Sequence, residues 1–231
     1  GSAVRRTHIL PGHSDAAPQP AGMGSAAAGA GAGHRLLRAC YLLRAQIRLG
    51  RGDLLGATSD LERAGNEPAN PADRHGFGND AGVRAQILLE TGRRAEAIAA
   101  AETALEIARH EPFVLTPPLL RVLHRLDRGR EALEVLPAMP DVPFADAARL
   151  WANGDARGAA DVYAALELAP NAEALARLDA GRDLAAAGRH AEADVELQRA
   201  IDFYRGVRAV RYVSEAEALL SAAGEARAQP G

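Results

Sequence analysis

A five-residue step recurs along this 231-residue chain and constrains its fold more than any other feature. A turn residue, usually glycine, is followed five positions later by an alanine, as in GRHAEA at 188–193. The alanines of the five steps lie 40, 35, 27 and 34 residues apart, and they are Ala57, Ala97, Ala132, Ala159 and Ala193. Self-similarity at such periods is typical of helical repeat arrays, in which each repeat packs on its neighbours. The sequence therefore predicts an all-α fold, an α-solenoid of about five helix-turn-helix repeats.

The apolar residues around these alanines follow the period of an α-helix. Downstream of Gly188 one stripe is formed by Ala193, Leu197, Ala200, Ile201 and Tyr204. Spacings of three and four residues place them on one helix face. The turns are expected at Gly52, Gly92, Asp127, Gly154 and Gly188. Pro137 and Pro140 should cut one helix of the third unit short, and a helix over 210–223 should cap the array.

Small residues are placed where two antiparallel helices of a repeat should meet. We expect Gly181 and Ala193 to face each other across such a pair. The equivalent pairs upstream are Ala45 with Ala57, Ala85 with Ala97, and Ala147 with Ala159. A side chain no larger than a methyl group lets the helix axes approach closely, so these residues are predicted to serve packing.

Composition sets the expected domain boundaries. Residues 11–33 are rich in Pro, Gly and Ala, which offer little apolar surface to offset the entropy of ordering. We predict a disordered tail or linker over 1–33, a helical repeat domain over 34–224, and a short tail over 225–231.

Charge and residue usage exclude several classes of function. The net charge of −3 provides no basic field for nucleic acid or for an acidic membrane. All 27 basic residues are arginine, so chemistry that needs a lysine is absent. Cys40 is the single cysteine, and the histidines lack metal-site spacing, so no metal or other cofactor is predicted. With no nucleophile motif either, we expect a non-enzymatic protein, by default cytoplasmic.

The repeat layout resembles the tetratricopeptide repeat (TPR) over residues 34 to about 205, most strongly in the second and fifth units. Residues 148–224, with RLWANGDARGAADVYAAL and VRYVSEAEALL, also resemble the C-terminal TPR region of actinobacterial signalling regulators. Those regulators join a cyclase-like or DNA-binding domain to a STAND-type ATPase. The resemblance implies a sensor or assembly arm that binds proteins, including other domains of the same full-length chain. It carries over neither the cyclase nor the ATPase activity, because those residues are not in this sequence.

In TPR arrays the first helix of each pair lines the concave surface, and this geometry gives the candidate binding residues. They are Gln46, Gln86, Arg121, His124, Arg125, Trp151 and Arg182. Arginine forks suit carboxylates and a tryptophan suits a peptide anchor, so the predicted partner is a protein or peptide, with an acidic one favoured. The competing interpretation makes Trp151 a core residue.

Two alternatives stay open at this point. The first function is a scaffold for protein–protein interaction, and the alternative is a small-ligand sensor. An open groove would favour the scaffold. A deep enclosed pocket near Arg121, Trp151 and Arg182 would favour the sensor.

Asp179 and Asp183 could bind metal in principle. The neighbouring Arg177 and Arg182 favour a solvated charged face instead.

Overall fold

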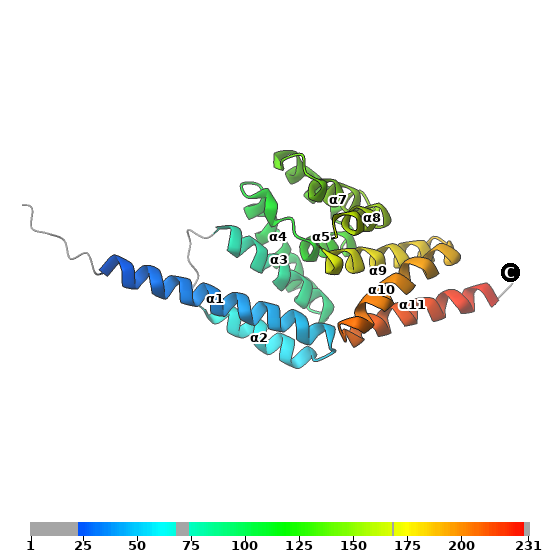
Figure 1. Cartoon of the computed structure of the whole chain (residues 1–231), viewed down its shortest axis with the longest axis horizontal. Coiled ribbons are helices and arrows are strands. Elements are labelled where there is room, and N and C mark those ends of the chain that lie inside the picture. Colours follow the sequence, from blue (N-terminus) through cyan, green and yellow to red (C-terminus); the bar gives the residue numbers. More distant parts are fainter. Residues whose placement is uncertain (1–22, 68–73, 168, 229–231) are drawn as a thin grey trace, which may run out of the picture.

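The computed structural model describes residues 23–67, 74–167 and 169–228, and every regular element in these ranges is a helix (Figure 1). Consecutive helices form antiparallel hairpins. The first two hairpins are α1 (Met23–Gly50) with α2 (Leu54–Asn66), and α3 (Arg74–Glu90) with α4 (Arg94–Ala108). None of the described helices is long and apolar enough to cross a membrane.

The middle and the end of the chain continue the same arrangement. A short 3-10 helix, η1 (Pro112–Val114), leads into α5 (Pro117–Arg125), which pairs with α6 (Gly129–Val135). A second one, η2 (Leu136–Ala138), precedes α7 (Pro143–Ala152) and its partner α8 (Ala156–Leu166). The last hairpin is α9 (Pro170–Ala186) with α10 (His190–Gly206), and α11 (Val210–Ala228) follows it. The all-α prediction is confirmed, with the described helices packed as neighbouring pairs.

The turns inside the hairpins lie where the sequence predicts them. Gly52, Gly92, Gly154 and Gly188 have φ angles between 74° and 88°, a conformation that costs glycine little. The third hairpin has Asp127 at φ 60° in the equivalent place, as expected for the one unit without a turn glycine. Two of the following helices are capped by an aspartate, since Asp53 and Asp155 accept hydrogen bonds from main-chain nitrogens three residues on.

The predicted small residues all lie in the core. Ala45, Ala57, Ala85, Ala97, Ala147, Ala159 and Ala193 have no exposed surface. Gly181 allows a close approach of α9 to α10, and the side chain that fills the space is that of Leu197, one turn beyond Ala193. A Cβ at residue 181 would lie 2.5 Å from two carbons of Leu197. The small residues therefore mark the helix contacts, with Leu197 as the immediate neighbour of Gly181.

The prolines shorten the third hairpin as predicted. α6 ends at Val135, and η2 with Pro137 at its centre takes over before α7 begins at Pro143. This explains the 27-residue step between Ala132 and Ala159.

The helical region extends further at both ends than the predicted limits of 34 and 224. α1 begins at Met23, because the alanines of this low-complexity stretch are the strongest helix formers and outweigh its glycines. α11 continues to Ala228. The remaining parts of the predicted tails, residues 1–22 and 229–231, lie outside the described residues.

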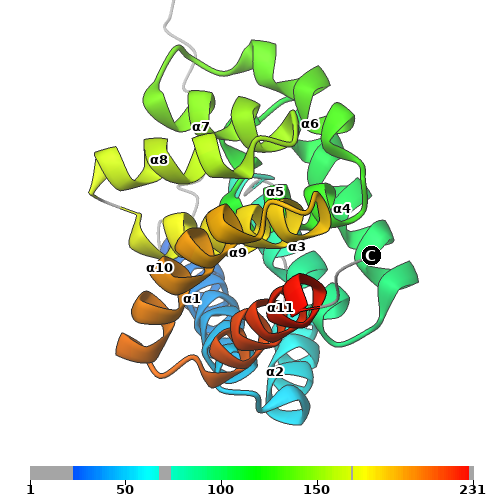
Figure 2. The same cartoon turned by 90° about the vertical axis from the view of Figure 1, so that its right-hand side faces the viewer.

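The first and the last helices of the described chain contact each other. The start of α11 lies beside the end of α1 (Figures 1 and 2), where a Cβ on Gly50 would be 3.3 Å from the Cβ of Ala209. Two contacts between α11 and α3 join residues far apart in sequence: Gln86 donates to the Tyr212 hydroxyl at 3.3 Å, and Arg211 donates to the Glu90 carbonyl at 2.7 Å. The C-terminal helix thus packs on α9 and α10 and also contacts the first two hairpins.

Candidate functional site

The inner surface, formed by the facing sides of α1, α3, α5, α9 and α11, carries a cluster of ionised side chains. Four of these helices contribute to it. We call the following residues the central ion cluster: Glu90, Arg121, Arg125, Asp179, Arg182, Arg211 and Glu215.

Arg121 lies at the centre of this cluster and is fully buried. Its guanidinium nitrogens lie 3.2 Å from Glu90, 3.2 Å from Glu215 and 3.5 Å from Asp179. Burial acts to lower the pKa of Arg121, but the three carboxylates outweigh it and hold that pKa well above its ordinary value. The expectation that Arg121 lines an open groove is therefore wrong, because its charge is compensated inside the protein.

Arg125 and Arg182, two other predicted binding residues, share carboxylates with Arg121. The Oε1 atom of Glu215 contacts all three guanidiniums, hydrogen bonding to Arg182 and lying 3.5 Å from Arg125. Arg125 also lies 3.5 Å from Glu90 Oε1, which Arg121 contacts as well. Carboxylates from α3, α9 and α11 lie among these arginines, so the surface carries charges of both signs.

The two buried carboxylates of the cluster, Glu90 and Asp179, respond differently to this environment. Burial raises the pKa of Glu90, but Arg121, Arg125 and Arg211 reverse the effect, so the net pKa is lowered. Burial also raises the pKa of Asp179, and here the nearby cations only partly offset it. Asp179 is thus the carboxylate of the cluster that resists ionisation.

His124 lies next to the cluster and pairs with Asp183 on α9. Its Nε2 atom is 2.8 Å from a carboxylate oxygen of Asp183. Burial lowers the pKa of His124, but the hydrogen bond to Asp183 and the charge of Asp179 raise it above its usual value. Asp179 and Arg177 are buried, so the interpretation of this stretch of α9 as a solvated charged face is wrong for both.

A polar cavity of about 540 Å³ opens beside the cluster. Arg125, Arg182 and Arg211 line it together with Glu90, Glu215, Ser214 and Gly52. The helices that contribute are α3, α5, α9 and α11, with the α1–α2 turn at one side. Arg121 and Trp151 do not line this cavity.

The predicted glutamines line a second, smaller cavity of about 250 Å³. Gln46 donates to Gln86 at 3.5 Å, and Gln86 donates in turn to Tyr212. The remaining walls are mostly apolar: Leu43, Ile47, Leu175, Tyr204, Val207, Ala209 and Tyr212, with Arg51 and Asn171 among them. The structure therefore separates the predicted site residues into an arginine group and a glutamine group.

Trp151 belongs to neither group. Its side chain is fully buried and packs edge-to-face on Tyr163, with ring centroids 6.2 Å apart. Phe144 packs on the other side of Tyr163 at 5.6 Å. The expectation that Trp151 anchors a peptide is wrong, because this aromatic group holds α7 against α8; the competing interpretation of Trp151 as a core residue is the correct one.

Sequence reasoning missed the carboxylates and the role of α11. Repeat geometry places the first helix of each hairpin on the inner surface, but it does not indicate that the C-terminal helix contacts α3. The signal available was the spacing of Arg211, Tyr212 and Glu215, which puts two charges and an aromatic ring on one side of a helix.

The described side chains give no catalytic arrangement that we recognise. No group of three or more histidine, cysteine, aspartate or glutamate side chains in this part of the chain is placed to hold a metal ion. Comparisons with protein-family models, with curated proteins and with solved structures find no match for the chain. What the inner surface can do chemically is bind: it offers guanidiniums in one cavity and amides beside apolar side chains in the other.

Proposed function

We propose that this protein is a non-enzymatic, TPR-like α-solenoid that binds a partner protein, as the sensor or assembly arm of a larger signalling regulator. Five consecutive helical hairpins, each with a left-handed turn residue and a buried alanine five positions later, support the repeat architecture. The resemblance of residues 148–224 to the C-terminal regions of such regulators supports the regulatory context.

The observation that carries the binding function is an apolar patch at the mouth of the glutamine cavity. Leu43 is 59% exposed, Ile47 46% and Val207 53%, and all three line this cavity. Leu43 and Ile47 are one turn apart on α1, and Val207 approaches from the α10–α11 connection. Clustered exposed apolar side chains next to a cavity are typical of protein interaction sites.

The chemistry of the cavity indicates the kind of segment it takes. An apolar side chain of the partner would fill the space between Leu175, Tyr204 and Tyr212. The amide of Gln46, which is both donor and acceptor, would bond the main chain beside that anchor, while the buried Gln86 holds Gln46 and Tyr212 in place. The partner is therefore a protein segment with one large apolar residue, and acidic charge is not required at this cavity.

A peptide-display selection against the full chain tests this proposal. Selected peptides should share one large apolar residue, and Leu43→Asp or Ile47→Asp should weaken their binding at least about tenfold, since burying an unpaired charge removes the anchor contact. Leu55→Asp is the matched control, because Leu55 is 87% exposed on α2 and lines neither the glutamine cavity nor the polar cavity. Peptides that bind the Leu43→Asp and wild-type chains equally well would exclude this surface.

A further inference from the structure

The polar cavity beside the central ion cluster is a second candidate site with different chemistry. It is separate from the patch proposed above, and the inference drawn from it goes beyond the proposed function. Its lining contains three guanidiniums, two carboxylates and one hydroxyl, all from side chains on four different helices or at their ends.

The central ion cluster has more positive than negative groups. Arg121, Arg125, Arg182 and Arg211 contribute four positive charges, and Glu90, Asp179 and Glu215 contribute at most three negative ones. His124 and Asp183 next to it form a pair of their own. By this count of side chains the cluster has one positive group more than it has negative ones.

The geometry shows that Arg125 is the most weakly paired of the four arginines. One oxygen atom, Glu215 Oε1, serves Arg121, Arg125 and Arg182 at once. Both contacts of Arg125 are 3.5 Å long and go to oxygens that other arginines already contact. Each guanidinium carries five N–H donors, so Arg125 in particular has donors without a close carboxylate.

The pKa of Arg125 agrees with its weak pairing to carboxylates. Burial lowers its pKa, and the like charges of Arg121 and Arg182 lower it further, against the attraction of Glu90 and Glu215. An added negative group near Arg125 would therefore be attracted. Guanidiniums bind carboxylates through two parallel hydrogen bonds.

We propose that this cavity binds a small organic acid through one carboxylate, held by Arg125, Arg182 and Arg211. A single negative charge balances the surplus, whereas a doubly charged phosphate would be repelled by Glu90 and Glu215. The cavity volume of about 540 Å³ is within the range of small-molecule sites. Ser214 and the two glutamates offer acceptors for hydroxyl or ammonium groups on the rest of the ligand.

Such a ligand would connect distant parts of the chain. Arg125 belongs to α5, Arg182 to α9 and Arg211 to α11, while Gly52 in the α1–α2 turn also lines the cavity. A bound acid would thus contact the first and the last hairpins together, so its binding should stabilise the contact between α11 and the first two hairpins.

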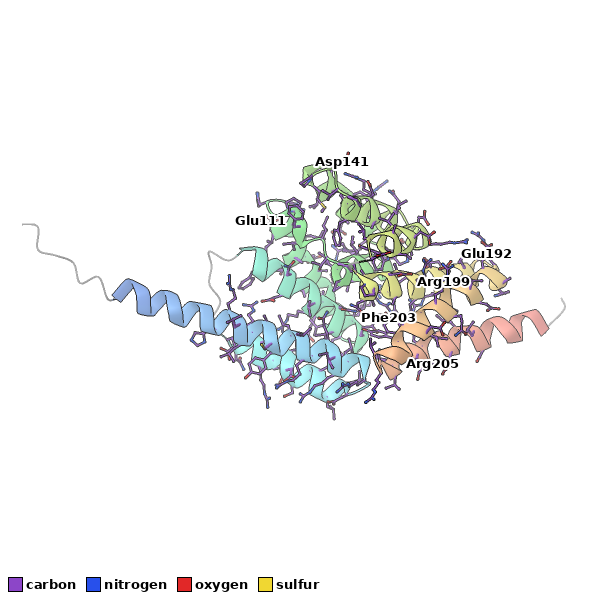
Figure 3. All side chains as sticks on the ribbon, viewed as in Figure 1. Glu111, Asp141, Glu192, Arg199, Phe203 and Arg205 are labelled. Carbon is purple, nitrogen blue, oxygen red and sulfur yellow. The ribbon has the colours of Figure 1, made fainter. Side chains whose placement is uncertain are left out.

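The test uses trifluoroacetate as a carboxylate probe, followed by ¹⁹F NMR in a titration of the full chain. We expect saturable binding that acetate displaces and chloride at equal ionic strength does not. Arg125→Gln, Arg182→Gln and Arg211→Gln should each weaken binding at least about tenfold, the effect of losing one charge-assisted hydrogen bond. The control is Arg199→Gln, an exposed arginine of α10 outside this cavity (Figure 3).

Glu215→Gln supplies a test that does not depend on loss of binding. The glutamate is the internal acceptor that a ligand carboxylate has to share, so its neutralisation should strengthen trifluoroacetate binding by about tenfold. Unchanged or weaker binding in this variant would overturn the proposal, as would wild-type affinity in the three arginine variants. Inorganic phosphate that displaces the probe better than acetate would show that the assigned ligand class is wrong.

The same assay separates this inference from the protein-binding function. Leu43→Asp should keep its affinity for trifluoroacetate while it loses the selected peptides. Loss of both activities in this variant would contradict the assignment of two independent sites.

Discussion

Arg177 shows at the scale of single residues how this all-helical core accommodates charge. Its side chain is 3% exposed, and it lies 2.7 Å from Glu196 on α10, 2.8 Å from Asp161 on α8 and 3.1 Å from Glu173. Glu196 is itself buried, and its Oε1 atom also lies 3.2 Å from Nε of Arg157. One guanidinium therefore joins three consecutive helices, and its removal would leave the Glu196 carboxylate inside the protein with a single partner.

We expect Arg177→Met to lower the free energy of unfolding by about 3 kcal/mol, because the buried Glu196 carboxylate then keeps Arg157 alone to compensate its charge. The double variant Arg177→Met with Glu196→Leu should recover most of this loss, since an apolar pair of similar volume restores the balance. Urea denaturation of the two single variants and the double variant measures the coupling. Additive losses would show that the two side chains act independently.

His124 gives the protein a pH-dependent contact. Because the folded pKa of His124 is raised, its contact with Asp183 stabilises the fold fully below the ordinary histidine pKa of about 6.5, and the contribution is lost as the pH rises through the folded value. The stability difference between wild type and His124→Gln should be larger at pH 5.5 than at pH 8.5 by about 0.5 to 1 kcal/mol, as for other partly exposed ion pairs. Denaturation at the two pH values measures it, and a difference independent of pH would contradict the assigned contact.

The elements are joined by left-handed turns, and Arg208 is one of the residues with a Cβ that occupy such a turn. Arg208, between α10 and α11, has a φ of 58° and an exposed side chain. The equivalent turn residue between α9 and α10 is Gly188, at φ 74° with open space around it. A side chain in this conformation costs about 1 kcal/mol or more relative to glycine.

Arg208→Gly should therefore raise the free energy of unfolding by about 1 kcal/mol, and Gly188→Ala should lower it by a similar amount. No new contact is involved at residue 188, because a Cβ there has no heavy atom within 4 Å. Thermal unfolding of the two variants provides the measurement. Changes of the same sign would show that backbone conformation does not decide the stability of these turns.

How far the elements could be predicted depends on whether local backbone preferences or tertiary contacts determine them. The turn at Asp127 and the early end of α6 follow from local backbone preferences, which are visible in the sequence. The start of α1 was missed, since the helix preference of alanine competes there with the flexibility of glycine. At the site, Gln46 and Gln86 lie together on the inner surface, and Arg125 and Arg182 share one cavity, whereas Trp151 and Arg121 are internal. Burial of those two depends on tertiary contacts that no repeat period encodes.

At the scale of the whole molecule, Tyr212 links the ends of the array. The centroid of its ring lies 4.8 Å from that of Tyr204, and its hydroxyl accepts a hydrogen bond from Gln86. The ring also lies beside Gly50 on α1. Repeat proteins usually depend on nearest-neighbour contacts alone. Here a contact across 126 residues adds a second connection between the first hairpins and the last.

Tyr212→Ala should consequently speed amide hydrogen exchange in α1 and α3 as well as in α11, with an overall loss of about 3 to 5 kcal/mol. Hydrogen exchange followed by mass spectrometry resolves these segments. Glu217→Ala is the control, because Glu217 is an α11 residue whose ion pair, with Arg205, stays within the last three helices. Faster exchange confined to α9, α10 and α11 would show that the ends are not coupled.

The meeting of α1 and α11 also limits how a gene for this protein can evolve. Open helical arrays lengthen readily by duplication of a repeat, since each new unit needs only two compatible neighbours. Here an inserted hairpin would carry α11 away from α1 and α3, and the partners of Tyr212 and Arg211 would no longer be within reach. Variants of this gene with one repeat more or fewer would have to replace those contacts, so the number of hairpins should stay constant while their surface residues diverge.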